Sequence, residues 1–369
     1  MQLYTFNQGG NFQMNQLTHP IGSFPRLIVV ALFALAVGAS EVPAQQQVEE
    51  LRALDRNGDM AISKQEAGET LWKRLSKRDA NGDGKVTETE LRNRGRKKKA
   101  SAIANAPEPP NFDEKHAYKK VGDTSLWLYA YKPKDHKANA KTPAIIFFFG
   151  GGWRNGSPSQ FAPHCEYFAE RGMVTITVEY RVSSRHSVKV EDCVEDARSA
   201  MRWVRGNATQ LGIDPDRIAS GGGSAGGHLA ACVSLIDDIN AKTDDQSVSP
   251  TPNAMVLFNP FMGLSDPGEV PENSRTRGPL EKVFPLTYAT RKQPPCVMFF
   301  GTADRLLVGA ELFRQKSVGA GNDCEIVTWE GQGHGFFNHG RGDGKYFKLT
   351  VAEADKFLSK LGWLKPKAE

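Results

Sequence analysis

Residues 217–230 read RIASGGGSAGGHLA, and the fold of most of the chain follows from this stretch. The pattern Gly-x-Ser-x-Gly, residues 222–226, stands between a short strand-like run and a run of small apolar residues typical of a helix. A strand–turn–helix of this kind projects the serine hydroxyl from the edge of a sheet. Glycine is required two residues before and after the serine, because a side chain at either place would collide with neighbouring backbone. The stretch therefore predicts an α/β domain in which Ser224 is a nucleophile.

Apolar runs and helical patterns alternate on both sides of this stretch. The runs expected as strands are 126–131, 144–149, 174–180, 217–221, 254–258, 295–300 and 325–329. The stretches expected as helices are 160–170, 191–211, 225–239, 309–318 and 347–361. Most strand runs are continuously apolar, as in a sheet covered on both faces, whereas the first suits an antiparallel edge strand. The alternation predicts a mainly parallel sheet with helices on both faces.

Three glycines, residues 150–152, follow one of these runs directly and precede Trp153. Acyl transfer builds negative charge on a carbonyl oxygen, and preorganised backbone N–H groups stabilise that charge. Glycine lets the backbone approach the oxygen closely. We expect the N–H groups of Gly151, Gly152 and Ala225 to form an oxyanion hole. The alternative is a tight turn that needs glycine for its geometry alone.

An acid and a histidine follow two later strand runs. Asp304 and His334 stand at the carboxyl ends of these runs, where open α/β sheets place their sites. The chain order Ser, Asp, His is that of the hydrolase plan. We expect His334 to accept the proton of Ser224 and to return it to a leaving alcohol, while Asp304 holds the imidazole. The alternative for Asp304 is a cap on the helix near Leu307.

Aromatic residues near these motifs suggest a substrate pocket. Trp153, Phe336 and Phe337 are the candidates to line it, and the irregular stretch 261–294 is a candidate partial lid. Aromatic side chains suit a core equally well, so both interpretations stay open. His228, on the expected helix after Ser224, is expected to be packed rather than catalytic.

Two acidic blocks near the N-terminus, residues 55–66 and 79–90, follow the D-x-N-x-D…E pattern of an EF-hand calcium loop. Ca²⁺ prefers six to eight oxygen ligands, which this loop supplies from fixed positions. The expected ligands are Asp55, Asn57, Asp59, Ala61, Ser63 and Glu66 in the first loop, and Asp79, Asn81, Asp83, Lys85, Thr87 and Glu90 in the second. Position 6 requires a positive φ and holds Gly84 in the second loop but Met60 in the first, so the first is expected to bind more weakly. Asx-rich turns without metal are the alternative.

The two loops start close together in the chain, which leaves room for one shared helix over residues 67–78. Ile62 and Val86 stand at equivalent positions and are expected to pair as a short two-stranded contact. We expect this Ca²⁺ to be structural and remote from Ser224, and catalysis to need no cofactor.

The first 44 residues have the features of an export signal. Arg26 precedes the apolar run 27–38, and Val42 and Ala44 supply small residues before an expected cleavage site. The run is too short for a membrane span, and Met14 is an alternative start. The expected organisation is a signal peptide over 1–44, an EF-hand pair over 45–91, a basic and Pro-rich linker over 92–110 and a catalytic domain over 111–369. The mature protein is therefore expected to be secreted or periplasmic.

Composition excludes several classes. The chain has 369 residues, of which 39% are hydrophobic and 24% charged, so it is neither wholly disordered nor a polytopic membrane protein. Its net charge of +5 owes much to the run 92–99, which is weak evidence for nucleic acid. The five cysteines follow no metal-binding spacing, and their pairing and the oligomeric state stay open.

Six motifs together carry a family resemblance. They are GGGW (150–153), EYR (179–181), LGIDPDRIA (211–219), GGSAGGHLA (222–230), GTAD (301–304) and GHGFFN (333–338). Through them residues 111–369 resemble the α/β-hydrolase fold and its exported carboxylesterase branch, which is related to hormone-sensitive-lipase-like esterases and to acetyl-xylan or feruloyl esterases. Residues 45–91 resemble the EF-hand pairs of exported bacterial proteins.

The resemblance implies a secreted serine ester hydrolase that acts on acetyl or feruloyl esters of polysaccharide. A lipase or general short-chain carboxylesterase, a peptidase and a non-catalytic calcium-stabilised binding protein are the alternatives, because a fold does not choose among substrates. One departure concerns Phe149, which stands where the family usually has a histidine that braces the glycine loop. Backbone N–H groups contact the oxyanion in the family, so activity is expected to survive this change.

Overall fold

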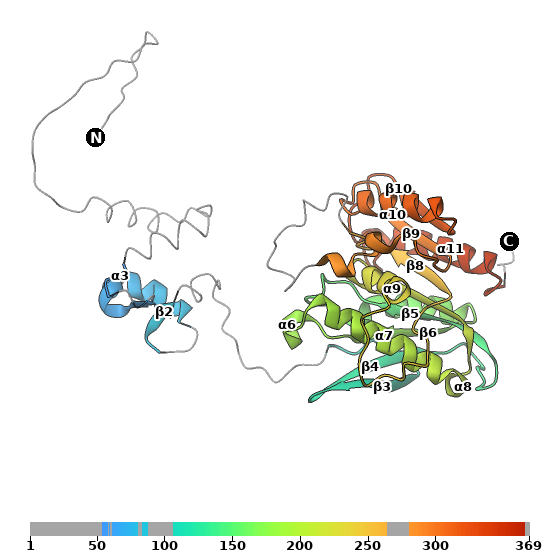
Figure 1. The fold of residues 1–369 in the computed structure, drawn as a ribbon, viewed down its shortest axis with the longest axis horizontal. Coiled ribbons are helices and arrows are strands. Elements are labelled where there is room, and N and C mark those ends of the chain that lie inside the picture. The colour runs from blue at the N-terminus through green and yellow to red at the C-terminus, as the bar shows by residue number, and fades with distance from the viewer. Residues whose placement is uncertain are drawn as a thin grey trace, which may run out of the picture. The chain divides into compact units, whose positions relative to one another are not determined.

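A computed structural model describes residues 54–57, 59, 61–79, 83–87, 106–263 and 280–365. The chain divides into two units, one within residues 1–101 and the other within 102–369 (Figure 1). The expected export signal, residues 1–44, lies outside the described residues. Within the described ranges, no helix has the length and apolar character that a membrane span requires.

The first unit contains a small sheet and one helix. Strand β1 (Ala61–Ser63) pairs antiparallel with β2 (Lys85–Thr87), with Ile62 opposite Val86, which confirms the expected contact. Between them lie α3 (Lys64–Leu75) and the 3₁₀ turn η1 (Ser76–Arg78). Leu75 is buried against the paired strands. The shared helix is therefore present and begins three residues before the expected start.

The second unit is built on an eight-stranded sheet. In chain order the strands are β3 (Glu114–Val121), β4 (Thr124–Tyr131), β5 (Thr142–Phe148), β6 (Val174–Val178), β7 (Ile213–Gly223), β8 (Ala254–Phe258), β9 (Cys296–Gly301) and β10 (Cys324–Trp329). Their order across the sheet is β10-β9-β8-β7-β5-β6-β4-β3 (Figure 1). Strand β4 runs antiparallel to both neighbours, and every other neighbouring pair is parallel. The expected mainly parallel sheet is confirmed.

The edge of this sheet differs from the expectation. Residues 126–131 form an antiparallel strand, but β3 lies outside it and is the edge. The sequence of β3, EKHAYKKV, has no apolar run that would have indicated a strand. Charged residues on an edge strand discourage pairing with other chains, and they also hide the strand from a hydrophobicity pattern.

Helices cover both faces of the sheet. They are α5 (Ala162–Glu170), α6 (Ser183–His186), α7 (Val190–Gly206), α8 (Ala208–Leu211), α9 (Ala225–Leu235), α10 (Leu307–Gly319) and α11 (Lys345–Lys360), with short 3₁₀ turns η2 (Pro158–Phe161), η4 (Leu280–Val283), η5 (Pro285–Tyr288) and η6 (Gly342–Gly344). Helix α7 packs on α9, and α11 packs on α5. The single helix expected over 191–211 is divided at Asn207, and the helix after Ser224 ends at Leu235 rather than 239.

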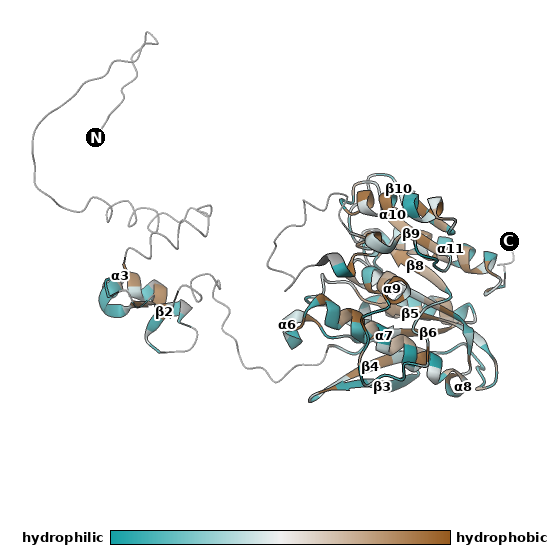
Figure 2. Ribbon diagram, in the orientation of Figure 1, coloured by the Kyte–Doolittle hydropathy of each residue, from teal (hydrophilic) through white to brown (hydrophobic). Residues whose placement is uncertain are grey.

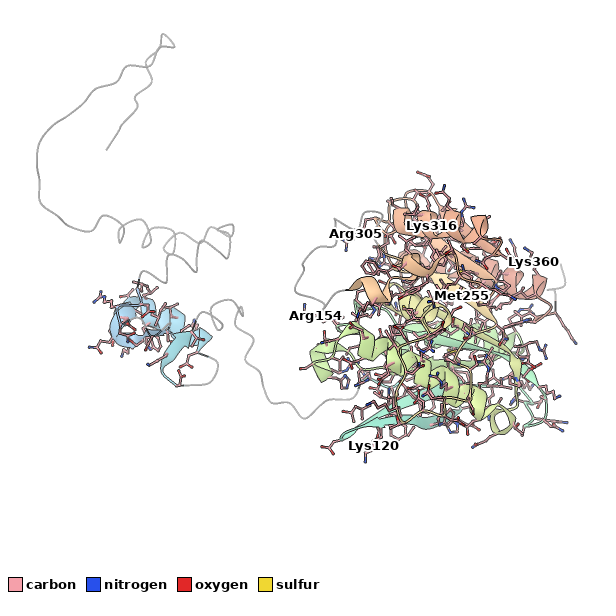
Figure 3. The ribbon with its side chains drawn as sticks, viewed as in Figure 1. Lys120, Arg154, Met255, Arg305, Lys316 and Lys360 are labelled. Carbon is pink, nitrogen blue, oxygen red and sulfur yellow. The ribbon has the colours of Figure 1, made fainter. Side chains whose placement is uncertain are left out.

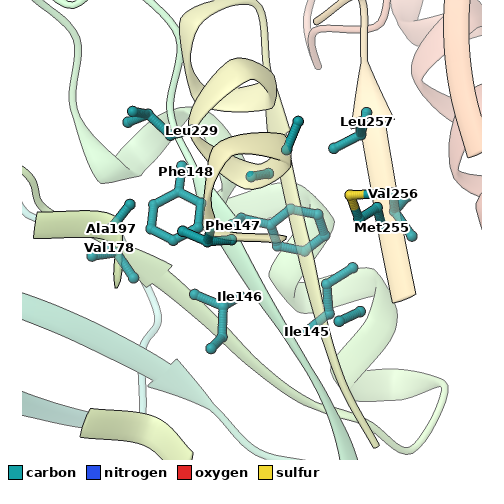
Figure 4. Packing of buried hydrophobic residues seen from close by; sticks show 14 of the residues in the cluster. Ile145, Ile146, Phe147, Phe148, Val178, Ala197, Leu229, Met255, Val256 and Leu257 are labelled. Carbon is teal, nitrogen blue, oxygen red and sulfur yellow. The ribbon is translucent and has the colours of Figure 1, made fainter. Parts of the chain in front are cut away.

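The central strand β5 is buried along its whole length. In Figure 4 its side chains from Ile145 to Phe148 pack between Val178 of β6, Leu229 of α9 and Met255 of β8. Figure 2 shows the strands as mostly hydrophobic and the outer sides of the helices as mostly hydrophilic. Charged side chains such as Lys316 project from the periphery in Figure 3. This burial explains why β5 was readable as a continuous apolar run.

The segment 106–110, here called the strap, belongs to the second unit. The expected linker extended to residue 110, but the amide of Ala106 donates to the buried Glu179 carboxylate at 3.1 Å. The hydroxyls of Ser159 and Tyr131 donate to carbonyls of the strap. Proline lacks an N–H but keeps its carbonyl, so a Pro-rich segment can dock through acceptors that composition does not reveal. The boundary at 111 is therefore corrected to include the strap.

One histidine is buried without polar partners. His164 is fully buried, and neither ring nitrogen has a hydrogen-bond partner among the described residues. Its ring contacts those of Phe161, Phe258 and Phe347 at centroid distances of 4.7, 5.0 and 4.8 Å. Burial lowers the pKa of His164 from 6.5 to about 3. Folding therefore excludes a proton that the unfolded chain takes up between these two values.

We expect this site to weaken the fold in acid. Its stability contribution is complete above pH 6.5 and is lost progressively as the pH falls toward 3. Replacing His164 by Phe removes the titrating group. The unfolding free energy of the variant minus that of the wild type should therefore increase by about 2 kcal/mol as the pH falls from 7 to 5. Urea unfolding of both proteins at the two pH values measures this difference. A difference independent of pH would mean that folded His164 takes up its proton normally.

Candidate active site

Ser224 occupies a strained turn between β7 and α9. Its backbone has φ +54° and ψ −118°, which L side chains rarely adopt. A Cβ added at Gly226 would lie 2.0 Å from the carbonyl oxygen of Phe148, and one at Gly222 would lie 2.5 Å from that of Gly226. Glycine is therefore required at both positions, as the motif predicted.

Three side chains from separate strand ends meet at this turn. His334 Nε2 lies 2.8 Å from Ser224 Oγ, and His334 Nδ1 lies 2.7 Å from Asp304 Oδ2. The Asp304 carboxylate is buried, whereas the His334 side chain is 42% exposed. Asp304 also accepts from the amide of Leu306 at 3.0 Å, so it holds the following turn as well as the histidine. The structure brings together the three residues that the sequence singled out.

The glycine loop lies directly against the serine. A Cβ added at Gly150 would be 3.4 Å from Ser224 Cβ. Gly151, Gly152 and Trp153 all have positive φ, and the Gly151 carbonyl accepts from two amides that follow it. The N–H groups of Gly151, Gly152 and Ala225 have no acceptor among the described residues. They therefore remain available to an oxygen held beside Ser224.

Comparison with known proteins identifies the family. The BD-FAE family model matches residues 128–266. Esterase 2 of Thermogutta terrifontis, in a structure phosphonylated by sarin, is 47% identical over 71% of this chain and 99% of its own, with a TM-score of 0.68. This chain belongs to the α/β-hydrolase esterases. These enzymes hydrolyse carboxylic esters. Other structures of esterase 2 are described as phosphorylated by paraoxon and as bound to propionate or butyrate.

Curated relatives of this esterase match over shorter regions. Carboxylesterase NlhH of Mycobacterium tuberculosis is 34% identical over 116 residues, which are 31% of this chain and 35% of the relative. A probable isoprenylcysteine alpha-carbonyl methylesterase of Arabidopsis thaliana, ICMEL1, is 25% identical over 231 residues, which are 56% of this chain and 48% of the relative. The chain thus spans about a third to a half of the length of these relatives.

The departure at Phe149 is accommodated by packing. Its buried ring stacks on Tyr180 with centroids 4.1 Å apart, and the Tyr180 hydroxyl donates to the Phe149 carbonyl at 2.7 Å. A different side chain contacts the glycine loop of the esterase: the Gly150 amide donates to Gln160 Oε1 at 2.6 Å. Sequence analysis did not single out Gln160, which has no motif around it.

The loop that carries His334 is held by two residues that the sequence analysis also missed. The Gly335 amide donates to Asn259 Oδ1 at 2.9 Å, and Arg341 donates to the His334 carbonyl at 2.6 Å. Asn259 is buried at the end of β8 with φ +37°. An Asn-Pro pair directly after a buried strand was the available signal for it.

His228 is packed, as expected. Trp153 Nε1 donates to His228 Nδ1 at 3.2 Å, and His228 Nε2 lies 2.6 Å from the Val283 carbonyl. Burial lowers the pKa of His228 to about 4, so the ring is neutral and its Nε2 proton donates to that carbonyl. This neutral ring links the residue after the glycine loop to η4. Residues 264–279 of the expected partial lid lie outside the described residues.

The three aromatic residues expected to line a substrate pocket differ in burial. Phe337 is buried against a stacked Phe161 ring and touches the position of Gly223, while Phe336 packs against Trp329. Both rings are buried, and whether either one lines a substrate pocket stays a prediction. Trp153 is partly exposed, and its place in a substrate pocket likewise stays a prediction.

The first acidic loop is stabilised by hydrogen bonds between its side-chain oxygens and its own backbone amides. All six expected ligands are described: Asp55, Asn57, Asp59, Ala61, Ser63 and Glu66. The Asn57 side chain accepts from the Asp59 amide at 2.9 Å, and Asp59 accepts from the Ala61 amide at 3.0 Å. Glu66 Oε2 accepts from the Ser63 amide at 2.9 Å and caps α3. The side-chain oxygens of Asn57, Asp59 and Glu66, which are expected Ca²⁺ ligands, thus accept from backbone amides of the same loop.

The second loop has the glycine geometry that the pattern requires. Asp79, Asp83, Lys85 and Thr87 are described, whereas Asn81 and Glu90 lie outside the described residues. Gly84 has φ +79°, and its amide donates to Asp79 Oδ2 at 3.0 Å. The Lys85 ammonium reaches the first loop and lies 2.8 Å from Asp59 Oδ2, which lowers the pKa of Asp59. Among the described side chains, no three His, Cys, Asp or Glu are gathered closely enough to hold a metal ion.

Substitution of Gly226 tests the geometry of the turn. In Gly226→Ala the new Cβ meets the Phe148 carbonyl, so α9 must move away from β5. We expect a loss of about 2 kcal/mol in stability, and loss of most ester hydrolysis because Ser224 moves with the helix. Gly319→Ala is the matched control, since its Cβ meets nothing within 4 Å. Wild-type turnover and thermal stability in Gly226→Ala would contradict the close contact.

Proposed function

We propose that this protein is a serine esterase that hydrolyses short-acyl carboxylic esters through an acyl-enzyme on Ser224. The observation that carries this proposal is the hydrogen-bonded series from Ser224 through His334 to the buried Asp304. A serine hydroxyl is a weak nucleophile until a neighbouring base accepts its proton. His334 is within hydrogen-bond distance of that proton.

In the first half-reaction Ser224 Oγ attacks the ester carbonyl while its proton passes to His334 Nε2. The oxygen of the tetrahedral intermediate is held by the N–H groups of Gly151, Gly152 and Ala225, each worth about 3 kcal/mol to the transition state. Asp304 keeps the proton of His334 on Nδ1 and stabilises the imidazolium. The imidazolium then protonates the departing alcohol, and the acyl group stays on Ser224.

In the second half-reaction water takes the place of the alcohol. His334 accepts a proton from this water, which attacks the acyl carbonyl and passes through a second tetrahedral intermediate. The same N–H groups stabilise the oxyanion. Collapse returns the proton to Ser224 and releases a carboxylic acid.

The acyl group is proposed to be short. Esterase 2 of Thermogutta terrifontis, which is 48% identical to this chain, has been solved with propionate bound and with butyrate bound. Its adducts with sarin and paraoxon support covalent chemistry at a corresponding nucleophile. For the alcohol, we propose a polysaccharide hydroxyl that carries an acetyl group. A feruloyl ester of polysaccharide, whose acyl group is larger, and an ester of a lipid or a small alcohol are the alternatives.

Two features of the N-terminal part complete the proposal. The segment 1–44 is proposed to direct export, which would bring the esterase to polysaccharide outside the cytoplasm. The loops at 55–66 and 79–90 are proposed to hold Ca²⁺ through carboxylate, amide and carbonyl oxygens, the donors that this hard cation prefers. Bound Ca²⁺ would supply structural stability to the first unit, and no catalytic step needs it.

An ester panel tests the catalytic proposal. We expect the purified full chain to hydrolyse p-nitrophenyl acetate, propionate and butyrate faster than octanoate, and Ser224→Ala to lose at least about a thousandfold in kcat. Release of acetate or ferulate from esterified xylan would then identify a polysaccharide hydroxyl as the alcohol of the substrate. Absence of turnover, together with failure of a phosphonate to label Ser224, would favour the non-catalytic binding protein.

Calcium titration tests the first unit. We expect Ca²⁺ to bind the full chain and to raise the unfolding free energy of residues 54–87 by about 3 kcal/mol at a hundredfold excess over Kd. Asp79→Asn should weaken binding, because Asp79 both supports Gly84 and supplies charge. Ester turnover should be unchanged by chelation. Binding undetectable by calorimetry would leave the loops as turns without metal.

A further inference from the structure

We propose that Gln160 is a positioning residue that holds the glycine loop and the His334 loop in register with each other. This inference rests on the proposed function, because it concerns the same oxyanion hole and the same base. Gln160 lies within the turn η2 and does not touch the reacting atoms. Its effect would pass through the backbone groups that it holds.

A continuous series of hydrogen bonds joins the two loops. The Gly150 amide donates to Gln160 Oε1 at 2.6 Å, and Gln160 Nε2 donates to Asn338 Oδ1 at 2.8 Å. Asn338 Nδ2 in turn donates to the Gly335 carbonyl at 2.8 Å. Gly335 directly follows His334. Two side-chain amides thus connect the first glycine of one loop to the residue after the histidine of the other.

The backbone groups at the two ends determine how both amides are oriented. The Gly335 carbonyl can only accept, so Asn338 must present its NH₂ group there and its oxygen to Gln160. The Gly150 amide can only donate, so Gln160 must present its oxygen there and its NH₂ group to Asn338. The two requirements agree. A side chain that spans them needs an acceptor and a donor on one rigid plane, which a carboxamide supplies and a carboxylate does not.

The first link lies close to the reacting centre. Gly150 packs against Ser224 Cβ, and the next two amides are the proposed oxyanion donors. Displacement of Gly150 would therefore tilt the N–H group of Gly151. A misplacement of this kind is costly because oxyanion donors act only when they are aimed in advance.

The side chain of Phe149 bears on the importance of the hydrogen bond between Gly150 and Gln160 in this chain. A phenyl ring has no hydrogen-bonding group, so the side chain of residue 149 cannot accept from the glycine amides of the loop. Its ring is instead committed to stacking on Tyr180. Among the described residues, Gln160 is the side chain that accepts from a glycine amide of the loop. We therefore assign the bracing role to Gln160.

Steady-state kinetics of Gln160→Ala and Asn338→Ala with p-nitrophenyl butyrate test the inference. We expect each to lower kcat about tenfold or more, with KM changed less than about twofold, because the loss falls on the transition state. The double variant should be little slower than either single variant, since one connection is broken in all three. Gln246→Ala is the matched control, because Gln246 also donates to backbone carbonyls but belongs to neither loop. Thermal unfolding of every variant accompanies the kinetics.

Gln160→Glu supplies a readout that a merely structural residue would not move. The ionised carboxylate accepts from Gly150 but opposes the oxygen of Asn338. The protonated carboxyl again offers a donor together with an acceptor. The ratio of kcat in Gln160→Glu to wild-type kcat should therefore rise as the pH falls from 8 to about 4.5, near the ordinary pKa of Glu.

The outcomes separate this inference from the proposed function. A wild-type protein without Ser224-dependent turnover overturns the proposed function. An active wild type with kcat in Gln160→Ala within twofold of it overturns the inference alone. Additive losses in the double variant, or a Gln160→Glu ratio independent of pH, also overturn it.

Discussion

The active site depends on one close contact between backbones. Helix α9 begins so near the end of β5 that the Phe148 carbonyl fills the space where a side chain at residue 226 would stand. This contact forces the turn at Ser224 and brings the glycine loop, which leaves β5, against the serine. A larger residue at 226 would separate nucleophile from oxyanion donors, because both are set by the distance between the helix and the strand. The buried apolar side chains of β5 maintain that distance from below.

At the carboxyl ends of the strands, hydrogen bonds supplement the apolar packing. The loop after β10 is connected to the loop after β8 by the bond between Gly335 and Asn259, and to the loop after β5 by the bond between Asn338 and Gln160. Each bond is worth only about 1 kcal/mol to stability. Their larger effect is geometric, because catalysis responds to the aim of a donor more steeply than folding does. Packing in the sheet therefore has the larger effect on stability, and the hydrogen bonds of the loops have the larger effect on reactivity.

The sequence was informative where a local pattern reflects a local constraint. The spacing around Ser224 and the apolar runs of β5 and β8 each arise from neighbours in the chain, so they were readable. The edge strand β3 was not readable, because its charged residues leave no apolar run that would indicate a strand. Gln160 was missed for another reason, since its partner Asn338 is 178 residues away and no spacing rule links them. Phe336 and Phe337 are buried near the histidine, and their place in a substrate pocket stays a prediction, because an aromatic residue in a sequence suits a core and a pocket equally.

The strap has a mechanical consequence for the esterase. Any tension on the chain that precedes residue 106 reaches the second unit at Ala106, where an amide is anchored to the buried Glu179. The next anchors are the carbonyls of Pro107, Glu108 and Pro110, which precede β3 and accept from the hydroxyls of Ser159 and Tyr131. Because Ser159 neighbours Gln160 in η2, a load on the strap would reach the residue next to the proposed positioning residue. The strap is therefore a path by which tension on the preceding chain would reach the turn that holds the glycine loop.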